Sequence, residues 1–258
     1  MPFAHLPHRA LLAVSGEEAE HFLEGLITSE LPGAGEAHGS ALLTPQGKIL
    51  FTFLVSRNDS GFLIECDASE RAGLMQRLSM YKLRAKVEVT ADDRPVSAGI
   101  GNGIADQRHP EMGSRHYGDT NASASLSDYT HKRASLGVLE GPDEILASQD
   151  FPHDVALDLT GAVAFTKGCF VGQEVVSRVK HRGTARRRPV LVKADGLTTG
   201  TAIASGEREI GTVRLANDGE GVAVVRIDQV KDVQAITIGG KAASLSVPPY
   251  ATYSIGGD

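Results

Sequence analysis

Apolar residues in the first 90 positions alternate or cluster over short runs, and polar turn residues separate these runs. Alternation with a period of two is typical of half-buried strands, and short continuous apolar runs are typical of buried ones. Residues 44–47 join two of the runs as a hairpin turn. The pattern predicts five strands, at residues 9–14, 40–43, 48–56, 62–66 and 85–90.

Two segments of the same region have the spacing of amphipathic helices. The apolar residues of segment 22–27 would share one face of a first helix, and Ser15 with Glu18 would form a capping box at its start. Asp67 and Glu70 indicate the capped start of a second helix. Two helices placed among these strands predict an α+β unit of ferredoxin-like type.

From Gly183 onward the pattern changes to short alternating runs separated by Gly, Asn, Asp and Pro turns. Residues 217–221 have the composition of a hairpin turn. Short strands without intervening helices predict a small β-barrel. The six predicted strands lie at 189–194, 202–204, 209–215, 221–227, 235–238 and 242–247.

Residues 91–150 give a weaker pattern, in which only segment 127–136 predicts a helix. Three glycines at positions 99, 101 and 103 do not form a dinucleotide-binding loop. No glycine stands at the third required spacing, and Pro110 blocks the helix that should follow.

Residues 166–183 hold the strongest candidate for chemistry. They place Cys169 between Gly168 and Gly172, with Lys167 two positions earlier, and then turn into a predicted helix. A thiol beside a helix start and a lysine should ionise more readily than a free cysteine. A small buried residue is the alternative, because free cysteines are mostly buried. A packing site, however, requires neither the glycines nor the polar pair that follows.

Composition narrows the class of protein. The 258-residue chain is 41% hydrophobic, as globular domains are, and its longest apolar run is too short to cross a membrane. The N-terminus resembles neither a signal peptide nor a transit peptide, so the sequence predicts a cytoplasmic protein without membrane contact. Two cysteines, Cys66 and Cys169, cannot form a zinc or cluster site alone, and no disulfide is expected in a reducing compartment.

The net charge is −6, but basic residues gather between Lys167 and Arg188, where Glu174 is the only acid. A local positive potential suits a small anion or an anionic partner, and a solvated basic surface is the equal alternative. RNA binding is a further alternative, but Phe170 is the only aromatic residue in this block, and single-stranded nucleic acid requires stacking platforms. Nucleic acid is therefore not expected as a partner.

The clearest likeness to a known family lies in the same stretch. The sequence Lys-Gly-Cys-Phe-Val-Gly-Gln-Glu at 167–174 resembles the signature of the YgfZ-type folate-binding proteins. These proteins are paralogues of the glycine-cleavage T-protein, an aminomethyltransferase, and include the mitochondrial iron–sulfur assembly homologues. Segments 106–115 and 129–141 also resemble that family.

This resemblance implies both a fold and a division of the chain. Two ferredoxin-like, T-protein-like α+β subdomains would span residues 1–90 and 91–182, and a C-terminal β-barrel would span 183–258. The three parts would surround a central hole lined by the signature.

The resemblance also implies a function, that of a folate-binding accessory factor for assembly or repair of iron–sulfur clusters. Cys169 would be the functional thiol, Lys167 would favour the thiolate, and a transient cluster would need further ligands from a partner. The implied partners are iron–sulfur assembly proteins or client enzymes, and the implied cofactor is tetrahydrofolate or a derivative. Gln173 and Glu174 would orient the loop by hydrogen bonds. The residues expected to contact the folate are Arg133, Gly172, Gln173, Glu174, Arg178 and Lys180.

Two positions depart from the T-protein pattern. The aspartate that takes part in methylene transfer follows a Gly-Gly-Ile turn in T-proteins, whereas segment 47–49 here is followed by Leu50, Phe51 and Thr52. Ser135 stands where T-proteins read the pterin with a glutamate. Glycine-cleavage aminomethyl transfer is therefore not expected. A tetrahydrofolate-dependent one-carbon transferase with an unidentified substrate is the enzyme alternative.

Overall fold

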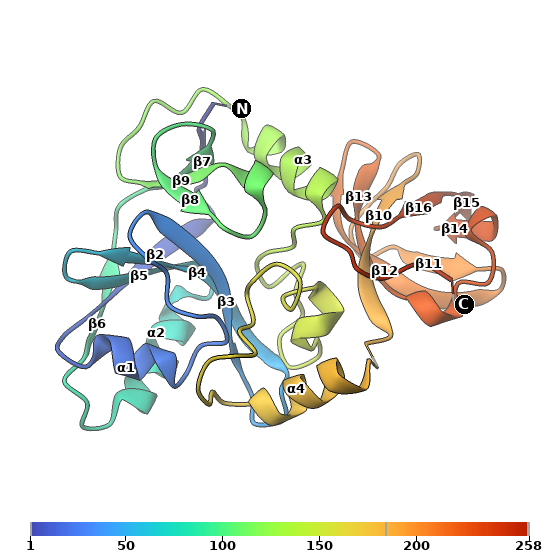
Figure 1. Ribbon diagram of the computed structural model, residues 1–258. Coiled ribbons are helices and arrows are strands. Elements are labelled where there is room, and N and C mark those ends of the chain that lie inside the picture. The colour runs from blue at the N-terminus through green and yellow to red at the C-terminus, as the bar shows by residue number, and fades with distance from the viewer. Residues whose placement is uncertain (1, 184, 257–258) are drawn as a thin grey trace.

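Two β-sheets form the framework of the chain in the computed structural model, which describes residues 2–183 and 185–256 (Figure 1). The first sheet has nine strands in the order β1-β7-β9-β8-β3-β4-β5-β2-β6, and its neighbours are antiparallel except for the parallel pair β3 and β8. Its strands are β1 (Ala4–His5), β2 (Arg9–Ser15), β3 (Glu36–Leu43), β4 (Ile49–Asn58), β5 (Gly61–Asp67), β6 (Glu88–Asp92), β7 (Val96–Gly99), β8 (Ile104–Asp106) and β9 (Ser114–Tyr117).

Helices α1 (Ala19–Glu24) and α2 (Arg71–Lys82) pack against the first sheet. Their buried apolar side chains, such as Leu23 and Leu74, join the inward-facing residues of β2, β4 and β5 in one core. This core accounts for the helical spacing of the apolar residues in the sequence.

Neither helix is capped as the sequence predicts. Ser15 ends β2 and pairs with both β5 and β6. The Glu18 carboxylate accepts a hydrogen bond from the Lys86 amide at 2.6 Å instead of bonding back to Ser15. Glu70 precedes α2 without a side-chain cap, and Asp67 accepts hydrogen bonds from Ser69. Sheet pairing thus overrides the local capping signals.

The second sheet has seven strands in the order β15-β14-β11-β12-β13-β10-β16 and curls into a nearly closed barrel (Figure 1). Alternate residues such as Val190 and Val192 point into its core. The predicted small barrel is confirmed, but it has seven strands instead of six, because the last predicted strand, at 242–247, is divided between β15 and β16. Its strands are β10 (Arg187–Lys193), β11 (Ala202–Ser205), β12 (Arg208–Asn217), β13 (Glu220–Arg226), β14 (Ile236–Ile238), β15 (Lys241–Ala242) and β16 (Ser244–Ser246).

Helices α3 (Leu126–Leu136) and α4 (Gln173–Arg182) lie between the two sheets in sequence, and α3 packs on β12 and β13 of the barrel. A shared core joins the β3–β4 hairpin, the signature region and the barrel through residues such as Ile49, Val176 and Val224. The remaining short helices are η1 (Pro110–Met112), η2 (Pro152–Val155), η3 (Ile227–Gln229) and η4 (Val233–Ala235).

The first sheet takes strands from both sides of residue 90, because β7, β8 and β9 extend the sheet that β2 to β6 begin. The division at residues 90 and 182 stays a prediction. The predicted α+β class with a C-terminal barrel is confirmed by this arrangement.

Candidate functional site

The signature loop is held against the β3–β4 hairpin by a close backbone contact at Gly172. Gly172 has a φ of 84°, and a Cβ atom there would lie 2.6 Å from the Thr44 carbonyl oxygen and 3.0 Å from the Gly47 Cα. Only glycine combines this positive φ with so close an approach. Phe170 is 6% exposed and anchors the other side of the loop in the shared core. Gly172 therefore has a structural role, and its predicted contact with folate stays a prediction.

Lys167 fastens the loop from the opposite side. Its Nζ atom donates to the carbonyl oxygens of Ile27 and Ser29, each at 2.8 Å. Burial lowers the pKa of Lys167 to about 8, against the opposing effect of the Glu24 and Glu30 carboxylates. These contacts give Lys167 a positioning role, and its predicted effect on the thiol stays a prediction.

The predicted place of the thiol at a helix start is wrong. Helix α4 begins at Gln173, four positions after Cys169. The field of a helix dipole falls off within the first turn. The helix start therefore adds little to the chemistry of Cys169, and the loop rather than the helix presents the sulfur.

Cys169 is exposed, and it lies at the edge of two hollows of the surface. One hollow, of about 510 Å³, also contains Lys167 and carboxylates such as Glu24 and Glu30. The other, of about 520 Å³, is lined by Pro45 and the segment that leads into α4. The alternative of a buried packing cysteine is therefore wrong for Cys169.

Cys66 has the opposite environment. It is buried in the core of the first sheet, and burial raises the pKa of its thiol to about 12. Cys66 is thus a packing residue, and Cys169 is the accessible thiol of the pair.

The polar residues that follow Cys169 belong to α4. Glu174 forms an ion pair with Arg178 one turn along the helix, so its carboxylate does not orient the loop as expected. The backbone N–H of Gln173 donates to the backbone carbonyl of Phe170 at 3.2 Å. The Lys180 Nζ lies 3.5 Å from the centre of the Phe165 ring. Contacts of Gln173, Glu174, Arg178 and Lys180 with a folate stay predictions.

A buried network of charges fills the space between β2, β8, β9 and α3, and the sequence analysis did not assign it. Arg108 bonds the Glu140 carboxylate at 2.7 Å and Asp106 at 2.8 Å. Arg115 lies 3.2 Å from Asp106 and donates to the Tyr129 hydroxyl at 2.7 Å. Full burial of these charges requires such pairing. The segments at 106–115 and 129–141 that resemble the family contain all five residues, and that likeness was the available signal.

Two arginines that could attract an anion are already paired in this region. Arg133 forms a bidentate ion pair with Glu144, with hydrogen bonds of 2.7 and 2.8 Å. Arg214 forms a bidentate ion pair with Asp150, with two hydrogen bonds of 3.1 Å. Ser135 uses its hydroxyl to donate to the Lys132 carbonyl at 2.9 Å. The predicted folate contact of Arg133 stays a prediction, while its observed role is to stabilise the network.

The residues around Thr52 do not fit a pterin ring. A cavity of only about 20 Å³ is lined by residues that include Thr52, Arg9, Arg108 and Glu140. A space of this size holds about one water molecule. Folate binding stays a prediction, and nothing in the function proposed below depends on it.

Cys169 has no preformed set of metal ligands around it. Within residues 2–183 and 185–256, no three His, Cys, Asp or Glu side chains form a group that could hold a metal ion. In the same ranges, none of the helices has the length and apolar character needed to cross a membrane.

The fold defined by these sheets is that of the T-protein class. The chain resembles the crystal structure of the glycine cleavage system aminomethyltransferase T from Bartonella henselae, with a TM-score of 0.76 over 96% of this chain and 86% of that one. Sequence identity is 18%, so this likeness concerns the fold alone. Residues 186–253 match the CAF17 C-terminal beta-barrel domain family, in agreement with the barrel described above.

Curated relatives identify the family within this class. The chain is 31% identical to the mitochondrial iron–sulfur cluster assembly factor IBA57 homologue of Chaetomium globosum, over 93% of this chain and 67% of that protein. It is 33% identical to the corresponding homologue of Pyricularia oryzae, over 72% of this chain and 56% of that protein. The chain belongs to the IBA57 family of T-protein-like iron–sulfur assembly factors.

The chain spans about half to two thirds of the length of these relatives. The relatives are named as mitochondrial proteins, which contradicts the cytoplasmic location expected from the sequence. That expectation rested on the character of the first residues, which is weak evidence about location.

Proposed function

We propose that this chain supports iron–sulfur cluster assembly through the thiol of Cys169. The proposal is supported by the family of the chain, whose members carry the name of assembly factors. The observation that carries it is the contrast between the two cysteines, because Cys169 is exposed beside two hollows and Cys66 is buried.

The loop geometry supports a role for Cys169 as a presented ligand. Gly172, Phe170 and Lys167 fix the loop at its two ends by backbone approach, burial and hydrogen bonds. The sulfur between these anchors is left accessible. A fixed backbone with an exposed thiol lowers the entropic cost of bringing a ligand to a cluster.

In this proposal the cluster is cargo, and Cys169 supplies one of its ligands. Iron–sulfur clusters are commonly held by four thiolates. No further ligands gather around Cys169 in the part of the chain that the structure describes. The remaining ligands would come from a partner assembly protein, a client enzyme or small thiols that reach the sulfur through the adjoining hollows. Binding would therefore be transient and shared.

The test is complementation of cells that lack an assembly factor of this family. The full chain should restore the activities of iron–sulfur enzymes measured in cell extracts, and Cys169→Ala should fail to do so. Cys66→Ala is the matched control, because it removes the other thiol and leaves the exposed one. Thermal unfolding of both purified variants shows that each is folded. Full restoration by Cys169→Ala would overturn the role of the thiol, and failure of the wild-type chain would overturn the proposed function.

The one-carbon transferase alternative gains no observation in its favour. The turn after β3 is followed by Leu50, Phe51 and Thr52, without a carboxylate. The cavity beside Thr52 has room for about one water. We therefore do not propose a transferase activity.

A further inference from the structure

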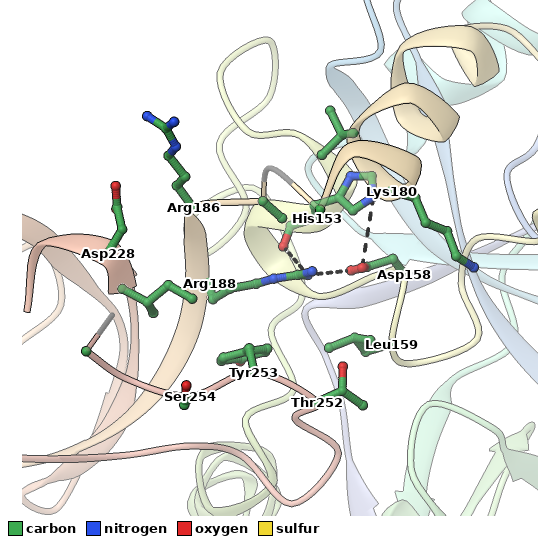
Figure 2. Close-up of a pocket in the computed structure, with 15 residues that line it drawn as sticks. His153, Asp158, Leu159, Lys180, Arg186, Arg188, Asp228, Thr252, Tyr253 and Ser254 are labelled. Carbon is green, nitrogen blue, oxygen red and sulfur yellow. Dashed lines mark hydrogen bonds and ion pairs between the residues drawn. The ribbon is translucent and has the colours of Figure 1, made fainter. Parts of the chain in front are cut away.

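A pocket of about 520 Å³ lies where the end of α4, the start of the barrel and the C-terminal segment meet (Figure 2). Four segments of the chain form its walls, and they contribute residues such as His153, Val179, Arg186, Ile227 and Tyr253. Cys169 is not among its lining residues, so the pocket is separate from the thiol site. Its volume falls in the range of small-molecule sites in proteins.

Arg188 forms a fixed wall of this pocket. Its Nη1 atom donates to the His153 carbonyl at 2.9 Å and to the Asp158 carboxylate at 2.8 Å, as Figure 2 shows. The guanidinium carbon also lies 5.2 Å from the centre of the Tyr253 ring. The Tyr253 hydroxyl is itself held by the Pro189 carbonyl. These contacts order the wall before any ligand arrives, which reduces the cost of binding.

Arg186, an exposed residue of the lining, supplies positive charge to the pocket, and this charge helps to lower the pKa of the nearby Asp228 carboxyl. Asp158 is neutralised by Arg188, and Asp228 is neutralised by Arg226 through two contacts of 2.9 Å. Arg186 forms no side-chain hydrogen bond or ion pair with any residue in the described ranges 2–183 and 185–256. An anionic group is the partner that a guanidinium in this position binds most strongly.

His153 provides a second, independent indication of a missing partner. Its side chain is 2% exposed, and neither ring nitrogen has a hydrogen-bond partner within the described part of the chain. The nearest carboxylate oxygen, on Asp158, is 4.0 Å from Nε2. Buried polar atoms without partners are rare, and each costs free energy until a ligand or water satisfies it. Burial also lowers the pKa of His153, so the ring is neutral and carries one donor and one acceptor.

The rest of the lining is suited to an organic ligand rather than to a bare ion. Leu159, Val179 and Ile227 contribute apolar surface, and Thr252 and Ser254 contribute hydroxyl groups. A mainly apolar wall with a few placed polar groups is typical of sites for organic molecules.

We propose that this pocket binds a small organic anion, with a phosphate or carboxylate group on an apolar, ring-sized body. Arg186 binds the anionic group, and Leu159, Val179 and Ile227 contact the body. His153 adjusts to give one ring nitrogen a partner in the complex. The proposal assigns a second site to the chain, beyond the thiol function.

The test uses two probes with the same ring, phenyl phosphate and benzoate, titrated calorimetrically into the full chain. At least one should bind with a dissociation constant of about 1 mM or lower, which titration to about 10 mM detects. The stronger probe identifies the anionic group. Arg186→Gln should weaken it about tenfold or more, the loss expected for one charge-assisted hydrogen bond.

Arg182→Gln is the matched control, because Arg182 is an exposed arginine of the same basic block that does not line the pocket. It should change the affinity less than about twofold, as expected for a screened surface charge. Absence of binding by both probes, or equal losses in the two variants, would overturn the proposal. Inorganic phosphate that binds as tightly as phenyl phosphate would overturn the assignment of an apolar body. The His153 ring signals in NMR spectra should shift with the bound probe, and unchanged signals would overturn its part in the site.

Discussion

Gly172→Ala tests whether the signature loop depends on a contact that only glycine allows. The φ of 84° is left-handed, which costs a residue with a Cβ atom about 1–2 kcal/mol. The new methyl group would also lie 2.6 Å from the Thr44 carbonyl oxygen and 3.2 Å from the Leu43 Cβ. Overpacking of this kind costs about 1–3 kcal/mol. We therefore expect a loss of about 2–5 kcal/mol in the free energy of unfolding.

Gly168→Ala is the matched control on the other side of Cys169. A Cβ atom at Gly168 would meet nothing within 4 Å, and the residue does not have a left-handed φ. The free energy of unfolding should change by less than about 0.5 kcal/mol. Comparison of Gly172→Ala with Gly168→Ala thus separates the effect of the close contact at Gly172 from a general need for glycine in the loop.

Urea denaturation of wild type and both variants measures these differences. The rate of Cys169 alkylation is a second readout, because a loop displaced from the hairpin presents the sulfur differently. A Gly172→Ala variant within about 0.5 kcal/mol of wild type would refute the argument. Equal losses in the two variants would refute it as well.

Three further predictions follow from the same contacts. Glu140→Gln leaves buried arginines without a counter-charge, so it should lower the free energy of unfolding, measured by urea denaturation, by about 3–5 kcal/mol. Asp228→Asn removes one partner of an exposed pair and should lower it by less than about 1 kcal/mol. Equal losses in the two variants would contradict the role of the buried network. The Lys167 side chain should titrate near pH 8 in NMR spectra. Between about pH 8 and pH 10.5, Lys167 is deprotonated in the folded chain and protonated in the unfolded chain, so the free energy of unfolding should rise with pH in this window. A titration midpoint at the ordinary 10.5 would contradict the burial of Lys167. A maleimide should label Cys169 and spare Cys66 in the native protein, and equal labelling would contradict their different burial.

The barrel could be predicted from the sequence because turn residues separate its short apolar runs, and strands such as β10 alternate between buried and more exposed residues. Val190 and Val192 point inward, and Leu191 between them is more exposed. Local alternation therefore reports the tertiary environment directly. The hairpin at 44–47 was predictable for a similar reason, since its turn residues and flanking apolar runs agree.

The middle of the chain could not be predicted because its strands depend on distant partners. Strand β7 pairs with β1 near the N-terminus, and β8 pairs with β3. These strands are three or four residues long, so no periodic pattern develops. Arg108 and Arg115 resemble exposed loop residues in the sequence, but in the fold both are buried and paired with acidic residues from separate elements. Only the completed fold shows this pairing.

The candidate site was predicted in part. The sequence indicated Cys169 as the functional thiol, and its exposure agrees with that role. The position of Lys167 against the carbonyls of Ile27 and Ser29 could not be predicted, because those groups lie about 140 positions away in the sequence. The pocket beside His153 was also missed, since its walls come from four separate segments.

Native mass spectrometry tests the central claim most directly. The full chain would be incubated without oxygen with ferric iron, sulfide and glutathione, which supplies the thiols that the chain lacks around Cys169. We predict an iron- and sulfide-bearing adduct on the wild-type chain and on Cys66→Ala, and its loss on Cys169→Ala. An adduct of equal abundance on Cys169→Ala would contradict the claim that this thiol holds the cluster.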